Sequence, residues 1–169
     1  MRRKDKEITD RELIDRIITG CQVVRLGLAQ DNIPYIVPVS FGYDGSALYF
    51  HTALTGRKLE FMAANPGVCF EFEQGVTLVS HESNPCNWTF SYQCVMGYGT
   101  LSELVALNEK TVGLLQVMRQ YGPGEWGFSN ESMDGIRVWK IAIESITGKQ
   151  SKDKFLALVG CGEARTASL

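Results

Sequence analysis

The sequence has no long apolar run and no marked excess of charge of one sign. None of its apolar segments approaches the roughly 20 residues that an α-helix needs to cross a bilayer. Its 17 Lys and Arg residues stand against 19 Asp and Glu residues, and charges of both signs alternate along the chain. Because proteins grip a nucleic-acid backbone with clustered basic side chains, we expect neither a nucleic-acid nor a membrane partner.

The opening residues also lack the pattern of a secretory signal. Residues 1–7 read MRRKDKE, and no apolar stretch follows them. A signal peptide needs a central apolar region after its basic start. We therefore expect a cytoplasmic protein.

Cysteine and histidine are few, and their spacing is not that of metal ligands. The chain has five cysteines and two histidines but no Cys-x-x-Cys or His-x-x-x-His pair, so we expect no metal site. Cys21, Cys69 and Cys94 lie in or beside apolar runs, where a free thiol packs like a small hydrophobic group. We predict that these three are buried and unpaired, and that Cys86 or Cys161 reacts first with a thiol reagent.

The sequence also lacks the common phosphate-loop and nucleophile motifs. There is no Gly-x-x-x-x-Gly-Lys-Ser/Thr, no Gly-x-Gly-x-x-Gly after a strand and no serine in a nucleophile elbow. No paired-carboxylate motif is present either. Without these motifs, the sequence shows few side-chain groups that could themselves break covalent bonds.

The periodicity of apolar residues predicts many strands and a few helices. Runs of adjacent strands, rather than alternating strand and helix units, favour a mainly β fold of the α+β class with an antiparallel barrel or strongly curled sheet. No linker divides the chain, and residues 73–89 have no clean period and predict a polar loop or a bent connection. The predicted helices span residues 9–19, 57–64 and 106–120, and the predicted strands span residues 23–28, 35–41, 47–52, 68–72, 90–101 and 136–144.

Single residues refine this prediction. Thr9 and Glu12 have the spacing of a capping box at the first helix. Pro38 has no N–H for a sheet ladder, so its strand is expected to be an edge there or to face something other than another strand. Gly97 and Gly99 are expected to mark sharp bends in a long strand.

The segment FHTALTGRK at residues 50–58 contains the strongest local signal of a binding site. A strand ends there, a short loop follows, and a helix begins with Arg57 and Lys58. Cations are unfavourable at a helix N-terminus unless an anion lies there, because the free N–H groups already make that end positive. Thr52 and Thr55 add hydroxyl donors. The residues alone allow either an anion site or a solvated first turn with two surface cations.

Two further features admit alternatives. His51 is either a donor and proton carrier beside a pocket or a polar residue at a strand end. Trp88 and Tyr92, with their aromatic neighbours, form either the wall of a pocket for a planar ligand or ordinary core and interface packing.

Several segments resemble the pyridoxamine-phosphate-oxidase-like split barrels. Within that family they are most similar to the nitroimidazole-resistance branch, a group of flavin-binding proteins. The resemblance covers residues 1–150, which implies one split-barrel domain that binds flavin mononucleotide (FMN), and residues 151–169 are left as a tail of unknown role. The segments are residues 34–43 (PYIVPVSFGY), 48–52 (LYFHT), 56–58 (GRK) and 65–70 (NPGVCF), supported by residues 1–8, 86–88 and 146–149.

The resemblance implies a six-stranded antiparallel split β-barrel with flanking helices, and it implies roles for named residues. Arg57 and Lys58 would hold the FMN phosphate, with Thr52 joining them and His51 beside it. Family members place the flavin at a homodimer interface, so Trp88 and Tyr92 would come from the second subunit. The backbone of four consecutive residues would line one edge of the isoalloxazine ring: Pro38, Val39, Ser40 and Phe41.

The resemblance implies function less directly than fold. It is consistent with an FMN-dependent oxidoreductase that reduces small electron-poor compounds such as nitroaromatics. We expect His51 to be the proton donor or anion holder, because an imidazole has a pKa suited to proton delivery at neutral pH. Alternatives are a flavin-binding module for storage or sensing, and the same barrel holding haem or a deazaflavin. Phe41 stands where vitamin-oxidising members carry a basic residue, and the C-terminal residues lack the basic pattern of those enzymes. Vitamin oxidation is therefore not expected.

Overall fold

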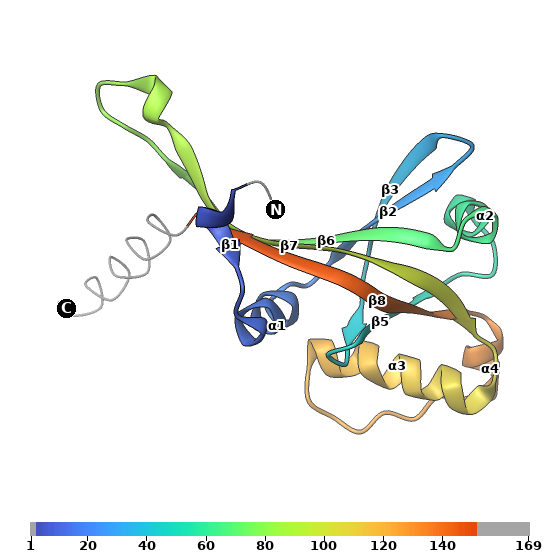
Figure 1. The fold of residues 1–169 in the computed structure, drawn as a ribbon. Helices are drawn as coiled ribbons and strands as arrows, with labels where there is room; N and C mark the ends of the chain where they lie inside the picture. The colour runs from blue at the N-terminus through green and yellow to red at the C-terminus, as the bar shows by residue number, and fades with distance from the viewer. Residues whose placement is uncertain (1–2, 152–169) are drawn as a thin grey trace.

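The protein is described by a computed structural model that places residues 3–151. Its centre is one antiparallel sheet, in which β3, β2, β6, β7, β8, β5 and β4 are neighbours in that order and β1 pairs with β8. The long strands curve around an apolar interior (Figure 1). The eight strands in the described part are β1 (Glu7–Ile8), β2 (Val24–Gln30), β3 (Ile33–Val39), β4 (Gly42–Tyr43), β5 (Ala47–Thr52), β6 (Gly67–Val79), β7 (Thr89–Leu104) and β8 (Arg137–Gln150).

The predicted fold class is confirmed, with two strands more than the six expected. The additional strands, β1 and β4, have two residues each. β1 pairs with the C-terminal end of β8, and β4 pairs with β5. β3 is an end strand of the sheet, as the position of Pro38 predicts, because a proline can be tolerated there without breaking a second ladder.

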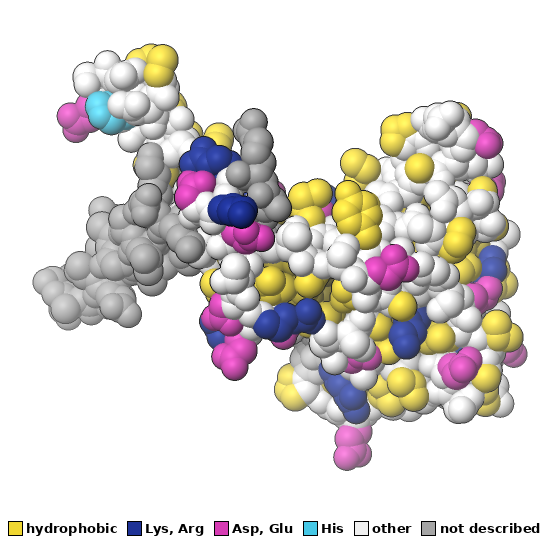
Figure 2. Space-filling view, in the orientation of Figure 1, with side chains coloured by type: hydrophobic (Ala, Val, Ile, Leu, Met, Phe, Trp, Pro, Cys, Tyr) yellow, Lys and Arg dark blue, Asp and Glu magenta, His cyan; other side chains and the backbone are white. Residues whose placement is uncertain are grey.

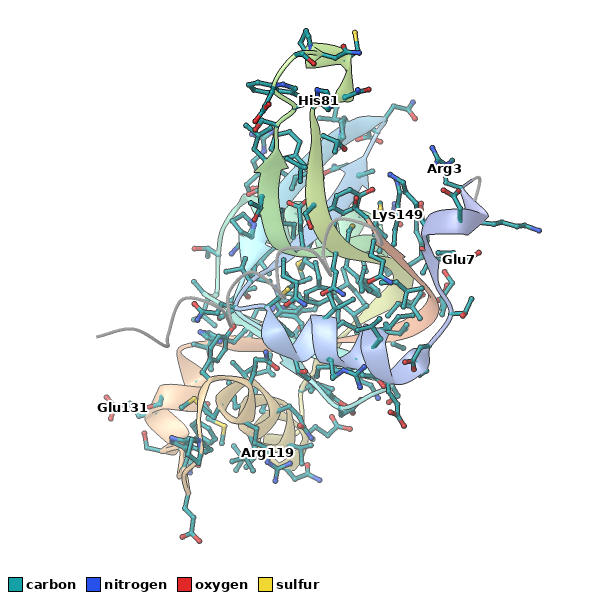
Figure 3. All side chains as sticks on the ribbon, turned by 90° about the vertical axis from the view of Figure 1, so that its left-hand side faces the viewer. Arg3, Glu7, His81, Arg119, Glu131 and Lys149 are labelled. Carbon is teal, nitrogen blue, oxygen red and sulfur yellow. The ribbon has the colours of Figure 1, made fainter. Side chains whose placement is uncertain are left out.

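Residues 73–89, predicted as a polar loop or a bent connection, form the end of β6, the start of β7 and the turn between them. β6 and β7 continue as a paired ladder past a register shift after Gln74, and Leu78 lies opposite Phe90. Gly75 has φ +65° at this shift, a conformation that favours glycine. We call residues 75–91 the hairpin arm. It projects away from the barrel, with His81 near its tip (Figures 1 and 3).

The two glycines expected to bend β7 lie where another strand and a core ring come very close. A Cβ atom on Gly97 would lie 2.2 Å from Cζ of Phe70, and one on Gly99 would lie 2.3 Å from the carbonyl oxygen of Ala142. The register between β7 and β8 shifts between Tyr98 and Gly99. These positions therefore require glycine, and the bend they allow helps to close the barrel.

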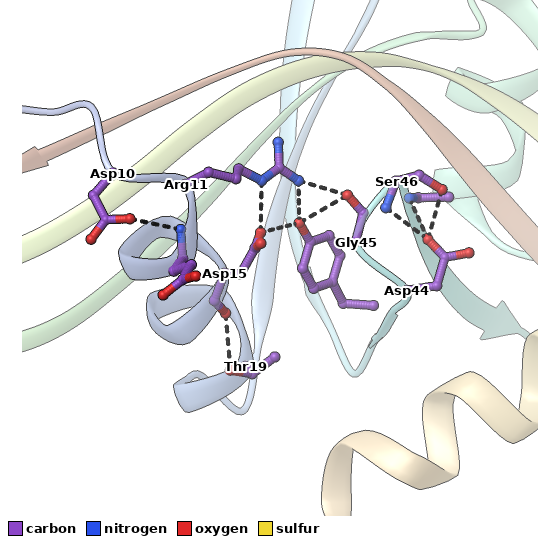
Figure 4. Close-up of polar contacts among 10 residues, drawn as sticks. Asp10, Arg11, Asp15, Thr19, Asp44, Gly45 and Ser46 are labelled. Carbon is purple, nitrogen blue, oxygen red and sulfur yellow. Dashed lines mark hydrogen bonds and ion pairs between the residues drawn. The ribbon is translucent and has the colours of Figure 1, made fainter.

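The first helix, α1 (Arg11–Gly20), begins one residue later than a capping box at Thr9 predicts. Asp10 is the N-cap, and its carboxylate accepts from the backbone N–H of Glu12 at 2.9 Å. An aspartate satisfies a free helix N–H as well as a threonine does. The helix is then fastened to the β4–β5 turn, because Asp15 accepts from both Arg11 and the Tyr43 hydroxyl (Figure 4).

The other helices are α2 (Arg57–Ala64), α3 (Leu107–Tyr121) and α4 (Asn130–Asp134), with short 3₁₀ turns at Lys4–Lys6 and Pro85–Asn87. α3 lies close against the sheet because a glycine lies on each side of the contact, Gly42 on β4 and Gly113 on α3. A Cβ on Gly42 would lie 2.2 Å from the backbone carbon of Gln116, and one on Gly113 would lie 2.9 Å from side-chain carbons of Leu104 and Val138. This close packing places α3 directly over β4 and β5.

The main core lies inside the barrel and is built from aliphatic and aromatic side chains. Phe41, Phe50, Phe70 and Phe72 are fully buried there. Ile17 of α1 joins them from the open side of the barrel, with no exposed area. Every helix placed by the structure is too short or too polar to span a bilayer.

The described cysteines are all unpaired, as predicted. Cys21 is buried and Cys86 is exposed, while Cys69 and Cys94 are only partly buried rather than fully so. Burial, together with nearby Glu71, raises the pKa of Cys94 to about 12. Cys161 lies outside the described residues.

Candidate functional site

The start of α2 leaves two cations without a protein partner. Gly56 is the N-cap, with φ +138°, and it offers no side chain to the free N–H groups of the first turn. Arg57 and Lys58 follow directly. Among residues 3–151, no carboxylate lies within 4.0 Å of either cation. The helix end and both side chains therefore present uncompensated positive charge to solvent.

The guanidinium of Arg57 is held against two aromatic rings. Its central carbon lies 5.3 Å from the ring centre of Tyr35 in β3 and 5.6 Å from that of Phe61 in α2. Tyr35 and Phe61 contact each other, with ring centres 5.0 Å apart. Cation–π attraction fixes the plane of the guanidinium without occupying its N–H groups. Arg57 is thus positioned between α2 and β3 with its donors available.

Exposed and buried residues alternate from the end of β3 to Phe41. Pro38 and Ser40 are exposed, whereas Val39 is buried in the core. Phe41 is fully buried, and its backbone N–H donates to the Tyr121 hydroxyl at 3.0 Å. Of the four predicted residues, Phe41 therefore has neither exposed side chain nor free N–H to offer a ligand.

Thr52 turns its hydroxyl into the protein rather than toward the helix start. The hydroxyl donates to the carbonyl oxygen of Ala53 at 2.9 Å and accepts from Nε1 of Trp139 at 3.2 Å. Thr52 is also almost fully buried. Its side chain thus supports the end of β5 from inside, and Thr55 is the exposed threonine of this loop.

His51 points to the opposite face of β5. Side chains alternate along a strand, so Phe50 and Thr52 face the barrel interior while His51 faces α3 and α4. There it lines a pocket of about 290 Å³ together with Val117, Met133 and neighbouring apolar side chains. Partial burial, reinforced by the charge of Lys58, lowers the pKa of His51 below its ordinary value. The ring is therefore mainly neutral at neutral pH.

Trp88 and Tyr92 lie far from the other predicted residues within one chain. Trp88 is exposed, and its indole N–H donates to the carbonyl oxygen of His81 on the hairpin arm. Tyr92 lies where the arm meets the barrel, with Lys149 5.7 Å from its ring centre. The hairpin arm and α2 lie at opposite ends of the molecule (Figure 1). A single chain therefore brings Arg57, Lys58 and His51 near one another, but neither aromatic residue.

Sequence reasoning missed the pocket wall formed by α4 and the residues before it. The local signal was present, since the Ser129 side chain caps the helix by accepting from the N–H of Ser132 at 3.2 Å. A helix of five residues is too short to show apolar periodicity. In the described part of the chain, no group of three His, Cys, Asp or Glu residues is arranged to hold a metal ion.

Residues 10–150 match the family model for pyridoxamine 5'-phosphate oxidase. The chain belongs to the pyridoxamine 5'-phosphate oxidase family. The family predicted from the sequence is therefore confirmed. The match ends at residue 150, where β8 ends.

Solved structures show the same split barrel. A candidate 5-nitroimidazole antibiotic resistance protein from Bacteroides thetaiotaomicron is 29% identical, with 85% of each chain covered and a TM-score of 0.76. An FAD- and haem-binding protein from Mycobacterium smegmatis is 20% identical, with 90% of this chain and 80% of that chain covered and a TM-score of 0.72.

Among curated proteins, this family member matches an uncharacterised protein of Rhizobium meliloti. The two are 28% identical over 67 residues, which is 40% of this chain and 44% of that protein. The match thus spans less than half the length of that relative.

Proposed function

We propose that this protein binds FMN and acts as an oxidoreductase that reduces small electron-poor compounds such as nitroaromatics. The observation that carries the proposal is the start of α2, where Arg57 and Lys58 lack a carboxylate partner in the described structure and lie beside free backbone N–H groups. Such a helix start is suited to an anion. The phosphate of a flavin is the anion that family membership favours.

The surrounding residues fit an FMN phosphate in charge and direction. Arg57 offers a planar fork of donors and Lys58 a single charge, two complementary ways to bind phosphate. Tyr35, which Arg57 contacts, belongs to β3, and Pro38 and Ser40 are exposed further along the same segment. In this proposal the backbone of that segment lines one edge of the ring system. Bound FMN would supply electron transfer, while the chain binds it, orients it and controls access.

His51 is the proposed proton donor. It is a titratable side chain between Lys58 and the apolar pocket, and its lowered pKa keeps it mainly neutral at neutral pH. A neutral imidazole carries one N–H and can donate a hydrogen bond to a nitro or carbonyl oxygen. Its proposed role is to hold the acceptor by this hydrogen bond and, in its minor protonated form, to transfer a proton to it, not to balance the flavin phosphate.

We further propose that the protein is a homodimer with the flavin at the interface. Trp88 and the arm residues Val76, Leu78 and Phe90 are exposed apolar side chains, and the hairpin arm is too narrow to bury them itself (Figure 2). In a two-fold dimer, each subunit would bind the hairpin arm of the other. Trp88 and Tyr92 would then reach the α2 end of the other subunit.

A flavin-binding module without fixed turnover is the second candidate. It is favoured by the scarcity of substrate-directed groups, since the described chain shows no paired acids and no second arginine cluster near α2. A haem- or deazaflavin-binding barrel ranks third. Haem needs an axial ligand, and within one chain His51 is the histidine placed near the proposed site, since His81 lies on the arm (Figure 3).

The absorption spectrum of the purified protein tests the cofactor, and anaerobic reoxidation tests the activity. The two bands of oxidised flavin are expected, whereas a Soret band would favour haem. After chemical reduction of the bound flavin, a nitroimidazole or quinone should reoxidise it faster than it reoxidises free reduced FMN. Equal rates with both acceptors would favour the binding module. His51→Ala should lower this rate more than it lowers FMN affinity.

A further inference from the structure

A pocket of about 290 Å³ lies on the outer face of β5, between α3 and α4. Its walls come from three elements that are distant in sequence, with His51 from β5, Val117 and Met118 from α3, and Met133 from α4. An apolar cavity of about 150 Å³ is enough to bind benzene. The volume here therefore suits a molecule of about two fused rings.

Polar contacts outside the pocket position α4, which forms one of its walls. Nζ of Lys110 donates to the carbonyl oxygens of Met133 at 3.0 Å and Ile136 at 3.2 Å, and these bonds tie α4 to α3. Ser129 caps α4 at its other end. The Lys110 bonds therefore set the position of the C-terminal end of α4 relative to α3, and the Ser129 cap stabilises the helix itself.

The chemistry of the walls selects an uncharged ligand. The lining contains no Lys, Arg, Asp or Glu, and apart from His51 and Ser132 it is made of aliphatic, methionine and phenylalanine side chains. The Ser132 hydroxyl already contacts the Ser129 hydroxyl at 2.9 Å. The His51 ring makes no hydrogen bond to any residue from 3 to 151. An ion would lose its hydration here without compensation, whereas one hydrogen-bond acceptor would meet the imidazole N–H.

We propose that this pocket binds one neutral, two-ring aromatic molecule, with a nitro or carbonyl oxygen directed at His51. The inference rests on the proposed function in one respect, because His51 would join this ligand to the flavin site. It names the substrate class for that site: flat, uncharged acceptors whose apolar rings enter between α3 and α4. Pocket shape then determines which acceptors the protein prefers.

Direct binding tests the pocket without relying on turnover. Coumarin is a neutral two-ring probe with a carbonyl oxygen, and 1-naphthoate is an anion of similar size. Calorimetric titration of the purified protein, with and without FMN, should show saturable binding of coumarin. Binding of 1-naphthoate should be at least tenfold weaker at pH 7.5.

Two matched substitutions on α4 locate the binding site. Ser132→Phe places a ring in the pocket and should weaken coumarin binding at least tenfold. Glu131→Phe adds the same ring on the side of α4 that points to solvent (Figure 3) and should leave binding unchanged. FMN affinity should be the same in both variants and the wild type. Met118→Trp fills the pocket from α3 and replaces Ser132→Phe if that variant does not fold.

The outcomes distinguish a failure of the pocket proposal from a failure of the proposed cofactor. Unchanged coumarin binding in the filled variants, absence of saturable binding, or displacement of coumarin by FMN would each overturn the pocket proposal. Coumarin binding that depends on Ser132 in a protein that does not bind FMN would support the pocket and refute the proposed cofactor.

Discussion

The guanidinium of Arg57 owes its position to aromatic rings and not to a carboxylate. Tyr35 and Phe61 hold it by its faces, so its N–H groups remain available for a ligand. Arg137 shows the contrast, because its Nε donates to Glu103 at 2.8 Å and its donors are occupied. The neighbours of each arginine therefore decide its role: Arg57 has donors available for a ligand, whereas Arg137 links two strands.

Replacing Arg57 with alanine tests its role as phosphate ligand. Arg57→Ala should weaken FMN binding by about 1–3 kcal/mol, the usual range for hydrogen bonds to a charged group. Riboflavin has no phosphate, so it should bind the wild type poorly and respond little to the substitution. Fluorescence titration with both ligands measures the difference. Arg119→Ala is the matched control, because Arg119 lies on α3, away from α2 (Figures 1 and 3). Equal losses for FMN and riboflavin would rule out a phosphate contact by Arg57.

At the scale of elements, local patterns predicted most helices and strands, and tertiary contacts account for the errors. α2 begins and ends where the sequence predicts because Gly56 and Asn65 mark its ends locally. The hairpin arm was missed because the register shift after Gln74 interrupts the alternation of β6. Its apolar residues are also exposed in the single chain, so no inward-facing pattern marks the strands.

The close contact between β4 and α3 predicts that one methyl group added at Gly42 would lower the stability of the protein. A Cβ on Gly42 would lie 2.2–2.4 Å from backbone atoms of Gln116 and Val117, which cannot rotate away. Gly42→Ala should therefore lower the free energy of unfolding by about 1–3 kcal/mol, the cost of overpacking. Urea denaturation measures this change. Gly122→Ala is the control, because a Cβ there meets no atom within 4 Å, and an equally small effect of both substitutions would contradict the close packing.

The Arg137–Glu103 pair between β8 and β7 predicts a pH-dependent contribution to stability. The hydrogen bonds from Arg137 lower the pKa of Glu103 in the folded protein. A carboxyl group with a lowered pKa stabilises the fold above its unfolded-state pKa, and this stabilisation is lost as pH falls through the folded value. Between pH 7 and pH 3, the wild type should lose more stability than Glu103→Gln, by up to about 1 kcal/mol for a partly exposed pair. Parallel urea curves for the two proteins across this range would contradict the prediction.

At the scale of the whole molecule, the candidate site shows what a linear sequence can and cannot reveal. Arg57 and Lys58 could be found because the signal, two cations at a helix start, is local. The pocket beside His51 could not, since it combines residue 51 with α3 and α4, which lie more than 55 positions further along the chain. The direction of the Thr52 hydroxyl was also unpredictable, because it depends on Trp139 in a neighbouring strand. Site features formed by residues that are distant in the sequence can therefore be identified only from the structure.

The hairpin arm leads to a prediction about the oligomer. Leu78 and Phe90 face each other across the arm and are both exposed, an arrangement that costs solubility unless a partner covers it. A two-fold partner would cover both arms at once. Small-angle scattering should therefore give about twice the 18.8 kDa mass of the chain.

Polar substitutions on the arm link this dimer to the flavin site. Leu78→Ser combined with Phe90→Ser removes apolar area only from the arm, so the barrel should stay folded while dimer dissociation rises at least tenfold. FMN affinity should fall with it, because Trp88 and Tyr92 would no longer reach the partner's α2. Val105→Ser, at an exposed apolar residue outside the arm, should change neither quantity. A wild-type monomer that binds FMN tightly would contradict the shared site, since every residue needed would then lie within one chain.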